Sequence, residues 1–316
     1  MTSAPTPNLW CPFPVRANEH VRIEEVEDQL LDWALCAGLL ADPAVRLRFT
    51  EAAFGECAAY VYPDAPDLLP YAKWLAWLFI ADDEFDENRA PATGGIDQGV
   101  LPLLPLDLDT PTRPATAVTT ALAELWRELA GPMPVPLRVR FRVHAEEYAR
   151  SYATDAARAR DGSAPDLGAY VALRRCSGAV ETCVDLIERQ PRARPANTSE
   201  QLRELRLAAN DIVCWSNDVL SVGKEVRHGE MTNLVAVLHH ATDMGWPAAV
   251  SAAAEMVNAR TAEFDLLQQD LAWPGAPAQQ IAFVEGLKSW IAGSLWWHRR
   301  SSRYHELPPM PVKSLV

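Results

Sequence analysis

The sequence DDEFD at residues 82–86 closes an apolar run that contains tryptophan. Asp82 and Asp86 are four residues apart, so on a helix their carboxylates share one face and can hold the same hard cation. Asp83 points about 100° away from Asp82 on an ideal helix, which predicts a supporting hydrogen-bond role. Glu84 adds a further negative charge to the stretch. The stretch therefore predicts a helix that ends in a cation-binding face.

A second stretch, NDVLSVGKE at residues 217–225, carries oxygen ligands at helical spacing. Asn217, Ser221 and Glu225 follow one another at i+4 steps, which places three oxygen ligands in one stripe along a helix. Mg²⁺ is usually held by a few carboxylates together with phosphate oxygens and water. Either stretch alone is also typical of a solvated helix face. Together they predict two incomplete metal sites with a phosphorylated substrate between them.

With these motifs the sequence resembles the bacterial class I terpene synthases, also called terpene cyclases. The resemblance rests on four landmarks in the family's order, which are the aspartate-rich motif at 82–86, the stretch RRCSG at 174–178, the motif at 217–225 and the pair Arg303-Tyr304. They span most of the chain. The resemblance implies an all-α fold, a class I terpene synthase-like helical bundle (isoprenoid synthase fold) around a central apolar pocket. It further implies one domain over residues 1–316.

The resemblance implies a Mg²⁺-dependent cyclase that removes diphosphate from a linear isoprenoid diphosphate, with farnesyl diphosphate favoured and a sesquiterpene as product. Three Mg²⁺ ions would serve as cofactors, with Mn²⁺ as a substitute. The implied metal ligands are Asp82, Asp86, Asn217, Ser221 and Glu225. The isoprenoid diphosphate is the expected partner, and the dimers common among relatives make a homodimer compatible with the family.

The resemblance also implies the side chains that bind diphosphate. Arginine suits this anion because its planar fork donates paired hydrogen bonds and stays charged. Arg174 matches the family's sensor arginine, with Ser177 and Gly178 at the helix break that follows it. Ser177 stands where related enzymes often have an acidic residue. Arg175 is the alternative sensor, and either arginine alone could instead pair on the surface. The remaining expected diphosphate contacts are Lys224, Arg303 and Tyr304, with Arg227 as a weaker candidate.

Eleven tryptophans in 316 residues provide many aromatic faces that could stabilise a carbocation. Phe79, three residues before Asp82, is the first candidate for the pocket wall. Core packing is the more frequent role for each aromatic residue taken singly. The further candidates are Phe54, Trp74, Trp77 and either Trp296 or Trp297.

Composition restricts the partners and the compartment. The formal net charge is −13 and the sequence pI is near 5.0, which argues against a nucleic-acid-binding protein because such proteins need clustered Lys and Arg. Six cysteines without CxxC spacing indicate reduced thiols and no zinc site. The sequence lacks a signal-peptide pattern and any uninterrupted apolar run of about 18 residues. We expect a cytoplasmic protein without stable membrane insertion.

Apolar positions recur at helical spacing in five stretches, and no window shows the alternation of a half-buried strand. The helical stretches are 21–40, 115–130, 139–160, 201–222 and 248–270. Prolines fall mainly between them. Residues 1–18 form an N-terminal segment, residues 88–114 form a long irregular stretch next to the aspartate-rich motif, and residues 307–316 form an irregular tail.

Three alternatives to a sesquiterpene cyclase stay open. A diterpene cyclase that acts on geranylgeranyl diphosphate would carry the same motifs. A chain-elongating prenyl diphosphate synthase would use the same cations, but it would carry two aspartate-rich motifs, whereas the second motif here is of the cyclase type. A non-catalytic helical binding module would keep the fold without turnover.

Overall fold

The structure is a computed structural model that describes residues 7–88, 99–161, 165–196, 199–228, 232–242, 244–271, 275–301 and 303. Within these ranges it describes the backbone alone at 84–88, 156, 158–161 and 227–228. Tyr304 and the predicted irregular tail at 307–316 lie outside the described residues. The prediction of one domain over residues 1–316 therefore stays a prediction.

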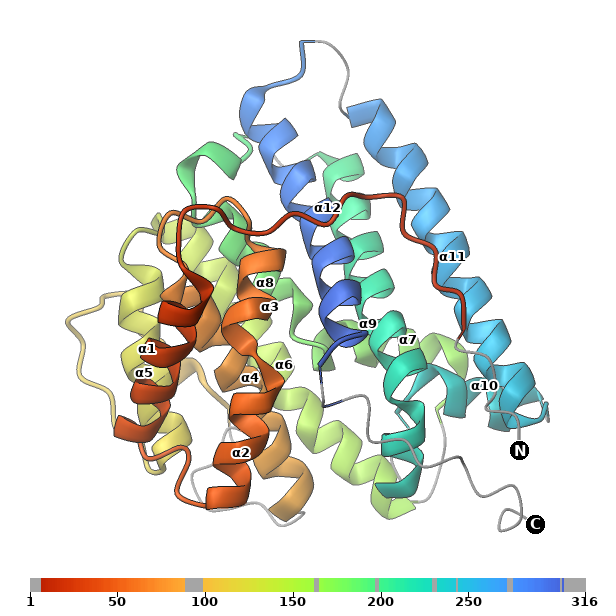
Figure 1. Cartoon of the computed structure of the whole chain (residues 1–316), viewed down its shortest axis with the longest axis horizontal. Coiled ribbons are helices and arrows are strands. Elements are labelled where there is room, and N and C mark those ends of the chain that lie inside the picture. The colour runs from red at the N-terminus through yellow and green to blue at the C-terminus, as the bar shows by residue number, and fades with distance from the viewer. Residues whose placement is uncertain are drawn as a thin grey trace.

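All regular structure in the described ranges is helical, which confirms the all-α prediction (Figure 1). The α-helices are α1 (Ile23–Cys36), α2 (Pro43–Ala52), α3 (Phe54–Val61), α4 (Leu69–Asn88), α5 (Ala117–Ala130), α6 (Val135–Asp161), α7 (Leu167–Ser177), α8 (Val180–Glu188), α9 (Glu200–His228), α10 (Leu234–Thr242), α11 (Trp246–Leu271) and α12 (Ala278–His298). Two 3₁₀ turns, η2 (Leu101–Leu103) and η3 (Pro191–Ala193), lie between them. The five predicted helical stretches coincide with α1, α5, α6, α9 and α11.

The observed helix ends differ from the predicted ends for local reasons. α1 stops at Cys36 because Gly38 takes a φ of +72°, a left-handed conformation that glycine adopts readily. α9 continues past residue 222 to His228, so the whole stripe from Asn217 to Glu225 lies on one helix. The irregular stretch 88–114 contains η2 in its described part.

From residue 7 onward, the N-terminal segment runs across α11 and α12 before α1 begins (Figure 1). The Trp10 backbone N–H donates to Asn258 Oδ1 at 2.7 Å, and Arg299 donates to the Leu9 carbonyl at 2.9 Å. These contacts join the beginning of the described chain to its last two helices.

The helices surround one hydrophobic core that includes two tryptophans of α4. Trp74 Nε1 donates to Thr182 Oγ1 at 3.1 Å, and Trp77 Nε1 donates to the Val118 carbonyl at 2.9 Å. Both indoles are about 1% exposed. Full burial of such a ring requires a partner for its N–H, and these partners attach α4 to α8 and α5.

Buried ion pairs join α6, α8 and α9. Asp185 is fully buried and accepts hydrogen bonds from Arg140 Nε at 2.8 Å and Arg206 Nη2 at 2.6 Å. Its second oxygen lies 2.8 Å from His144 Nδ1. Burial alone would raise the pKa of Asp185, but the charge of Arg206 and the contacts with His144 and Arg140 outweigh burial and hold this pKa below its usual range.

We expect Asp185→Asn to lower the free energy of unfolding by about 3 kcal/mol at pH 7, because the substitution leaves Arg206 buried without its full charge partner. Since the folded-state pKa is depressed, this contribution is complete above the unfolded Asp pKa of about 3.9 and is lost as the pH falls towards the folded value. The difference from wild type should be constant between pH 7 and pH 5 and should narrow below about pH 4. Urea unfolding monitored by tryptophan fluorescence measures the free energy of unfolding of both proteins at each pH.

The matched control is Asp64→Asn, because Asp64 pairs with Arg16 at side-chain exposures of 44% and 41%. An exposed pair of this kind contributes about 0–1 kcal/mol. Equal losses for the two variants would contradict the assignment of stability to the buried cluster.

The helices in the described ranges include none with the length and apolar character needed to cross a bilayer. All six cysteines are unpaired, and Cys57, Cys183 and Cys214 are buried. Burial raises the pKa of the Cys183 and Cys214 thiols to about 12, so both are protonated at neutral pH. This agrees with the prediction of reduced thiols.

Candidate active site

A cavity of about 160 Å³ lies at the centre of the bundle. The helices around it are α3, α4, α6, α7, α8, α9 and α12. Its lining comprises Cys57, Leu75, Leu78, Phe79, Asp82, Tyr148, Arg174, Ser177, Gly178, Ala179, Val180, Cys183, Val213, Cys214, Asn217, Ser221, Lys224, Glu225, Trp290, Ser294, Trp297, His298 and Arg303. Apolar side chains and charged groups therefore share one space.

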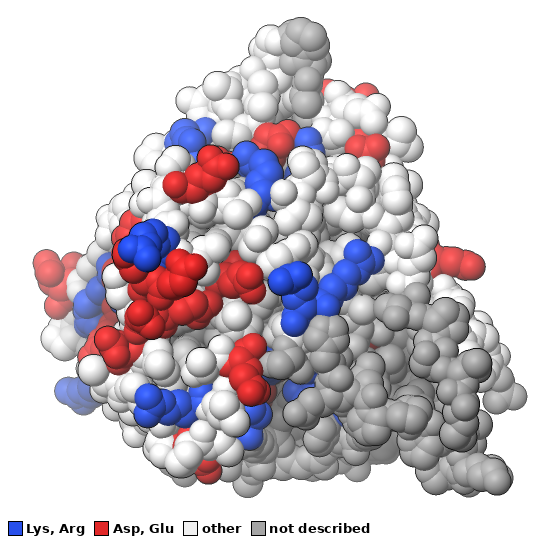
Figure 2. All heavy atoms as spheres, in the orientation of Figure 1, with Lys and Arg blue, Asp and Glu red and all other residues white. Residues whose placement is uncertain are grey.

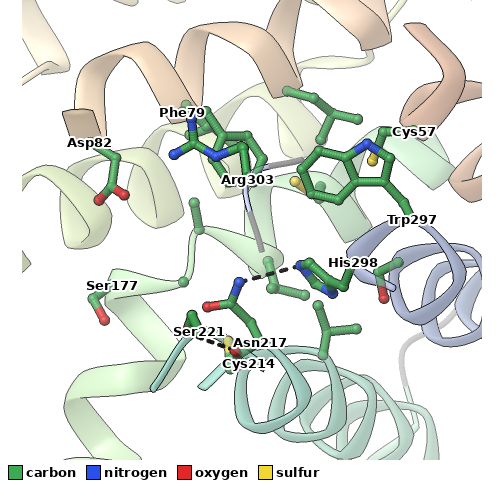
Figure 3. Close-up of a pocket in the computed structure, with 18 of the residues that line it drawn as sticks. Cys57, Phe79, Asp82, Ser177, Cys214, Asn217, Ser221, Trp297, His298 and Arg303 are labelled. Carbon is green, nitrogen blue, oxygen red and sulfur yellow. Dashed lines mark hydrogen bonds between the residues drawn. The ribbon is translucent and has the colours of Figure 1, made fainter. Parts of the chain in front are cut away.

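The two predicted metal motifs meet at this cavity. Asp82 reaches it from α4, whereas Asn217, Ser221 and Glu225 reach it from α9. Asp82 lies across the cavity from Asn217 and Ser221 in Figure 3. The backbone of Asp86 belongs to α4, but its side chain is not described.

On the α9 wall, neighbouring side chains orient the oxygen ligands. Ser221 Oγ donates to the Asn217 backbone carbonyl at 2.8 Å, and Asn233 Nδ2 donates to Glu225 Oε2 at 2.7 Å. Burial, followed by the charge of Asp218, raises the pKa of Glu225, and the contacts with Ser221 and Asn233 offset part of this rise. Burial makes the charged form of this carboxylate unfavourable, so the binding of a cation beside it is favourable.

The α4 wall contains the candidate metal ligand Asp82 and a salt bridge between Asp83 and Arg303. Tyr152 donates to Asp82 Oδ1 at 3.3 Å, and burial and the charge of Asp83 raise the pKa of Asp82. Asp83 accepts two hydrogen bonds from Arg303, at 2.9 and 3.0 Å. Burial acts to raise the pKa of Asp83, but its contact with Arg303 outweighs burial and lowers this pKa. Asp83 thus holds a cationic side chain at the cavity.

The two adjacent arginines of α7 point to different partners. Arg174 lines the cavity, where its Nε donates to Asp218 Oδ1 at 2.9 Å. Arg175 forms a bidentate pair with Asp211, at 2.7 and 2.8 Å. Asp218 is fully buried and also accepts hydrogen bonds from the Tyr170 hydroxyl and the Leu234 backbone N–H. Of the two candidates, Arg174 is therefore placed to meet a ligand in the cavity.

The expected helix break lies between α7 and α8. Ser177 and Gly178 end α7 and line the cavity, and Ala179 takes a φ of +53° before α8 begins. A Cβ on Gly178 would lie 2.3 Å from Cys214 Sγ. Glycine is required here because α9 approaches the break too closely for any side chain.

Three cationic side chains line the cavity beside the carboxylates Asp82 and Glu225, although the chain is acidic. They are Arg174, Lys224 and Arg303. Figure 2 shows acidic side chains gathered over α1, where Glu24, Glu25, Asp28 and Asp32 are exposed. Tyr304 lies outside the described residues, and only the backbone of Arg227 is described. The internal cations are placed to receive an anion.

Aromatic rings form part of the cavity wall. The Phe79 ring lies 5.4 Å from Trp297 and 4.7 Å from the guanidinium carbon of Arg303. Phe54 packs behind Phe79 at 5.1 Å in the core. Trp296 instead stacks on Tyr60 at 3.8 Å. Among the aromatic candidates, Phe79 and Trp297 line the cavity.

Some side chains at the cavity were not candidates from the sequence, namely Tyr148, Tyr152, Asp218, Trp290 and His298. His298 Nε2 accepts a hydrogen bond from Asn217 Nδ2 at 3.3 Å. Burial, followed by the charges of Arg174 and Arg303, lowers the pKa of His298 to about 3. Asp218 follows Asn217 directly in the motif at 217–225. This position in the motif was the sequence signal that could have identified it as a residue of the site.

The donor set fits a hard divalent cation. Within the described residues, His, Cys, Asp and Glu side chains form no group of three that could hold a metal by themselves. Asp82, Asn217, Ser221 and Glu225 nevertheless present oxygen atoms of three chemical kinds to one cavity. Mg²⁺ commonly takes only part of its ligands from protein and the rest from water and phosphate. Incomplete sites beside internal cations are consistent with that mode of binding.

Comparison with known proteins identifies the family. Residues 73–263 match the model of terpene synthase family 2, C-terminal metal binding. A (+)-T-muurolol synthase of Roseiflexus castenholzii, described as farnesyl diphosphate cyclizing, is 32% identical over 94% of this chain and 93% of its own length. A 4-epi-cubebol synthase of Streptosporangium roseum, with the same description, is 31% identical over 94% of this chain and 92% of its own length.

The fold has counterparts among solved structures. The germacradien-4-ol synthase of Streptomyces citricolor superposes with a TM-score of 0.75 at 26% identity, over 94% of this chain and 99% of that one. The family model covers more than half of the chain, and the relatives align along nearly all of it. The chain therefore belongs to terpene synthase family 2, and it is a class I terpene synthase.

Proposed function

We propose that the enzyme ionises farnesyl diphosphate and cyclises the resulting carbocation to a sesquiterpene with release of diphosphate. The observation that carries the proposal is the single cavity where opposing oxygen ligands, three cationic side chains and an apolar lining meet. The names of the two relatives given above support farnesyl diphosphate as the substrate.

In this proposal Asp82, Asn217, Ser221 and Glu225 hold Mg²⁺, with three ions in the complete site and Mn²⁺ as a substitute. When bound, the ions act as Lewis acids that neutralise the charge developing on the diphosphate. Arg174, Lys224 and Arg303 donate hydrogen bonds to the same anion. The allylic C–O bond breaks with both electrons going to the diphosphate oxygen.

The remainder of the lining guides the carbocation. The faces of Phe79 and Trp297 can stabilise it by about 0.5–2 kcal/mol each. The break at Ser177 and Gly178 places backbone groups beside it, as the resemblance implies. The apolar walls keep water away until ring closure, and a final proton loss or water capture ends the reaction.

The direct test is product analysis by gas chromatography and mass spectrometry with Mg²⁺ and one substrate at a time. Farnesyl diphosphate alone should give a cyclic C15 hydrocarbon or alcohol, in preference to geranyl and geranylgeranyl diphosphates. Preference for geranylgeranyl diphosphate would instead identify a diterpene cyclase. Product that forms only with added isopentenyl diphosphate would identify chain elongation and overturn the proposal.

Several expectations stay predictions within this proposal. They are metal binding by Asp86, a diphosphate contact from Tyr304, a homodimer and a cytoplasmic location, and Arg175 stays the alternative to Arg174 as the diphosphate sensor. A matched pair of variants discriminates Arg174 from Arg175.

A further inference from the structure

The side chain of Asn217 forms a hydrogen bond at each end, and Figure 3 shows the one to His298. Arg174 Nη2 donates to Asn217 Oδ1 at 2.9 Å, and Asn217 Nδ2 donates to His298 Nε2 at 3.3 Å. A guanidinium can only donate, and an amide nitrogen can only donate. Arg174 therefore selects the orientation in which Oδ1 faces its guanidinium, and His298 supports this orientation in the neutral tautomer that carries its proton on Nδ1 and accepts at Nε2.

The orientation matters because only one end of the amide can bind a metal. A carbonyl oxygen has two lone pairs and can accept a hydrogen bond and bind a cation, whereas the amide nitrogen cannot serve as a ligand for Mg²⁺. A rotation of about 180° around the last side-chain bond would exchange the two ends. It would remove one oxygen ligand from the α9 wall.

His298 is well placed to prevent that rotation. It ends α12 and is only 5% exposed, and its chain neighbour Trp297 is fixed by a 2.8 Å hydrogen bond from Nε1 to the Ala52 carbonyl. The end of α12 is therefore anchored to the end of α2. The imidazole acceptor has a defined position relative to α9.

We propose that His298 is a positioning residue that fixes the amide orientation of Asn217, so that Oδ1 is the end available to the metal. The inference rests on the proposed function, because it assumes that Asn217 is a metal ligand. It goes further by giving His298 a role that acts through Asn217.

His298 can fix an orientation only if residue 217 carries an amide, and a change of residue 217 to a carboxylate therefore tests the role of His298. A carboxylate has two equivalent oxygens, so its orientation needs no acceptor. Removal of the His298 acceptor should weaken metal binding in the wild-type background. The same change should have little effect when combined with Asn217→Asp.

The experiment measures Mn²⁺ binding to the enzyme in the presence of inorganic diphosphate, from the electron paramagnetic resonance signal of free Mn²⁺. We expect His298→Phe to weaken binding by about 10–100-fold, the usual range for partners of metal ligands. In the Asn217→Asp background we expect a change below about threefold. His298→Gln, whose amide oxygen can accept the same hydrogen bond, should restore much of the affinity.

The outcomes separate this inference from the proposed function. If His298→Phe weakens Mn²⁺ binding equally in both backgrounds, the role is structural and the inference is wrong. If Asn217→Ala leaves binding unchanged, the metal site itself is wrong and the proposed function fails. Thermal unfolding of each variant without metal shows whether a loss of binding reflects a loss of fold.

Discussion

Replacement of Arg174 by methionine is expected to lower kcat/KM for farnesyl diphosphate by about 10³-fold or more. Arg174 lines the cavity. Removal of an arginine that stabilises negative charge on a transferred phosphate group lowers the rate by a factor of this size. The same change at Arg175 should cost less than about tenfold. Steady-state kinetics with Mg²⁺ at saturation measures both.

The two neighbouring arginines form a matched pair. Arg175 donates to Asp211, which also accepts a hydrogen bond from Arg260 at 3.0 Å. Asp211 therefore keeps a charged partner in the Arg175→Met variant. Arg174→Met leaves the buried Asp218 without its charge partner and can therefore reduce stability as well. Arg174→Lys keeps the charge but loses the planar fork, and a large loss of kcat/KM in this variant at unchanged unfolding temperature assigns the loss to the cavity and not to stability. A greater loss from Arg175→Met than from Arg174→Met would reverse the assignment.

The two walls of the cavity could be predicted from the sequence because spacing alone fixes which side chains share a helix face. Asn217, Ser221 and Glu225 lie on the same stripe of α9 however that helix packs. Apolar periodicity and the prolines between the stretches predicted an all-α chain, whereas the bundle around a central pocket was implied by the family resemblance. Both inferences use local patterns, and helices are built from local contacts.

The choice between Arg174 and Arg175 could not be predicted because it depends on packing between distant segments. Adjacent residues on a helix point about 100° apart, so the rotation of α7 decides which one faces the cavity. The partners that fix this rotation, Asp211 and Asp218, lie on α9, 36 and 44 residues away. His298 is 81 residues from Asn217, and no spacing rule connects them.

Asp82→Asn and Asn217→Ala should each lower turnover of farnesyl diphosphate by about 10³-fold, because each removes a ligand that helps to neutralise the leaving diphosphate. The more discriminating result concerns the double variant. Asp82 and Asn217 belong to opposite walls of one cavity. If both walls must hold the same diphosphate at once, loss of either wall already removes most of the stabilisation.

The double variant should therefore be within about tenfold of the slower single variant, rather than near the 10⁶-fold loss that two independent contributions would give. Turnover across a range of Mg²⁺ concentrations measures the interaction, with Asp64→Asn as a control at an exposed residue that is not part of the lining. Losses that multiply would mean that the walls act on separate ligands. Unchanged product formation in both single variants would contradict the site itself, since the ionisation of the substrate would then be independent of both sets of oxygen atoms.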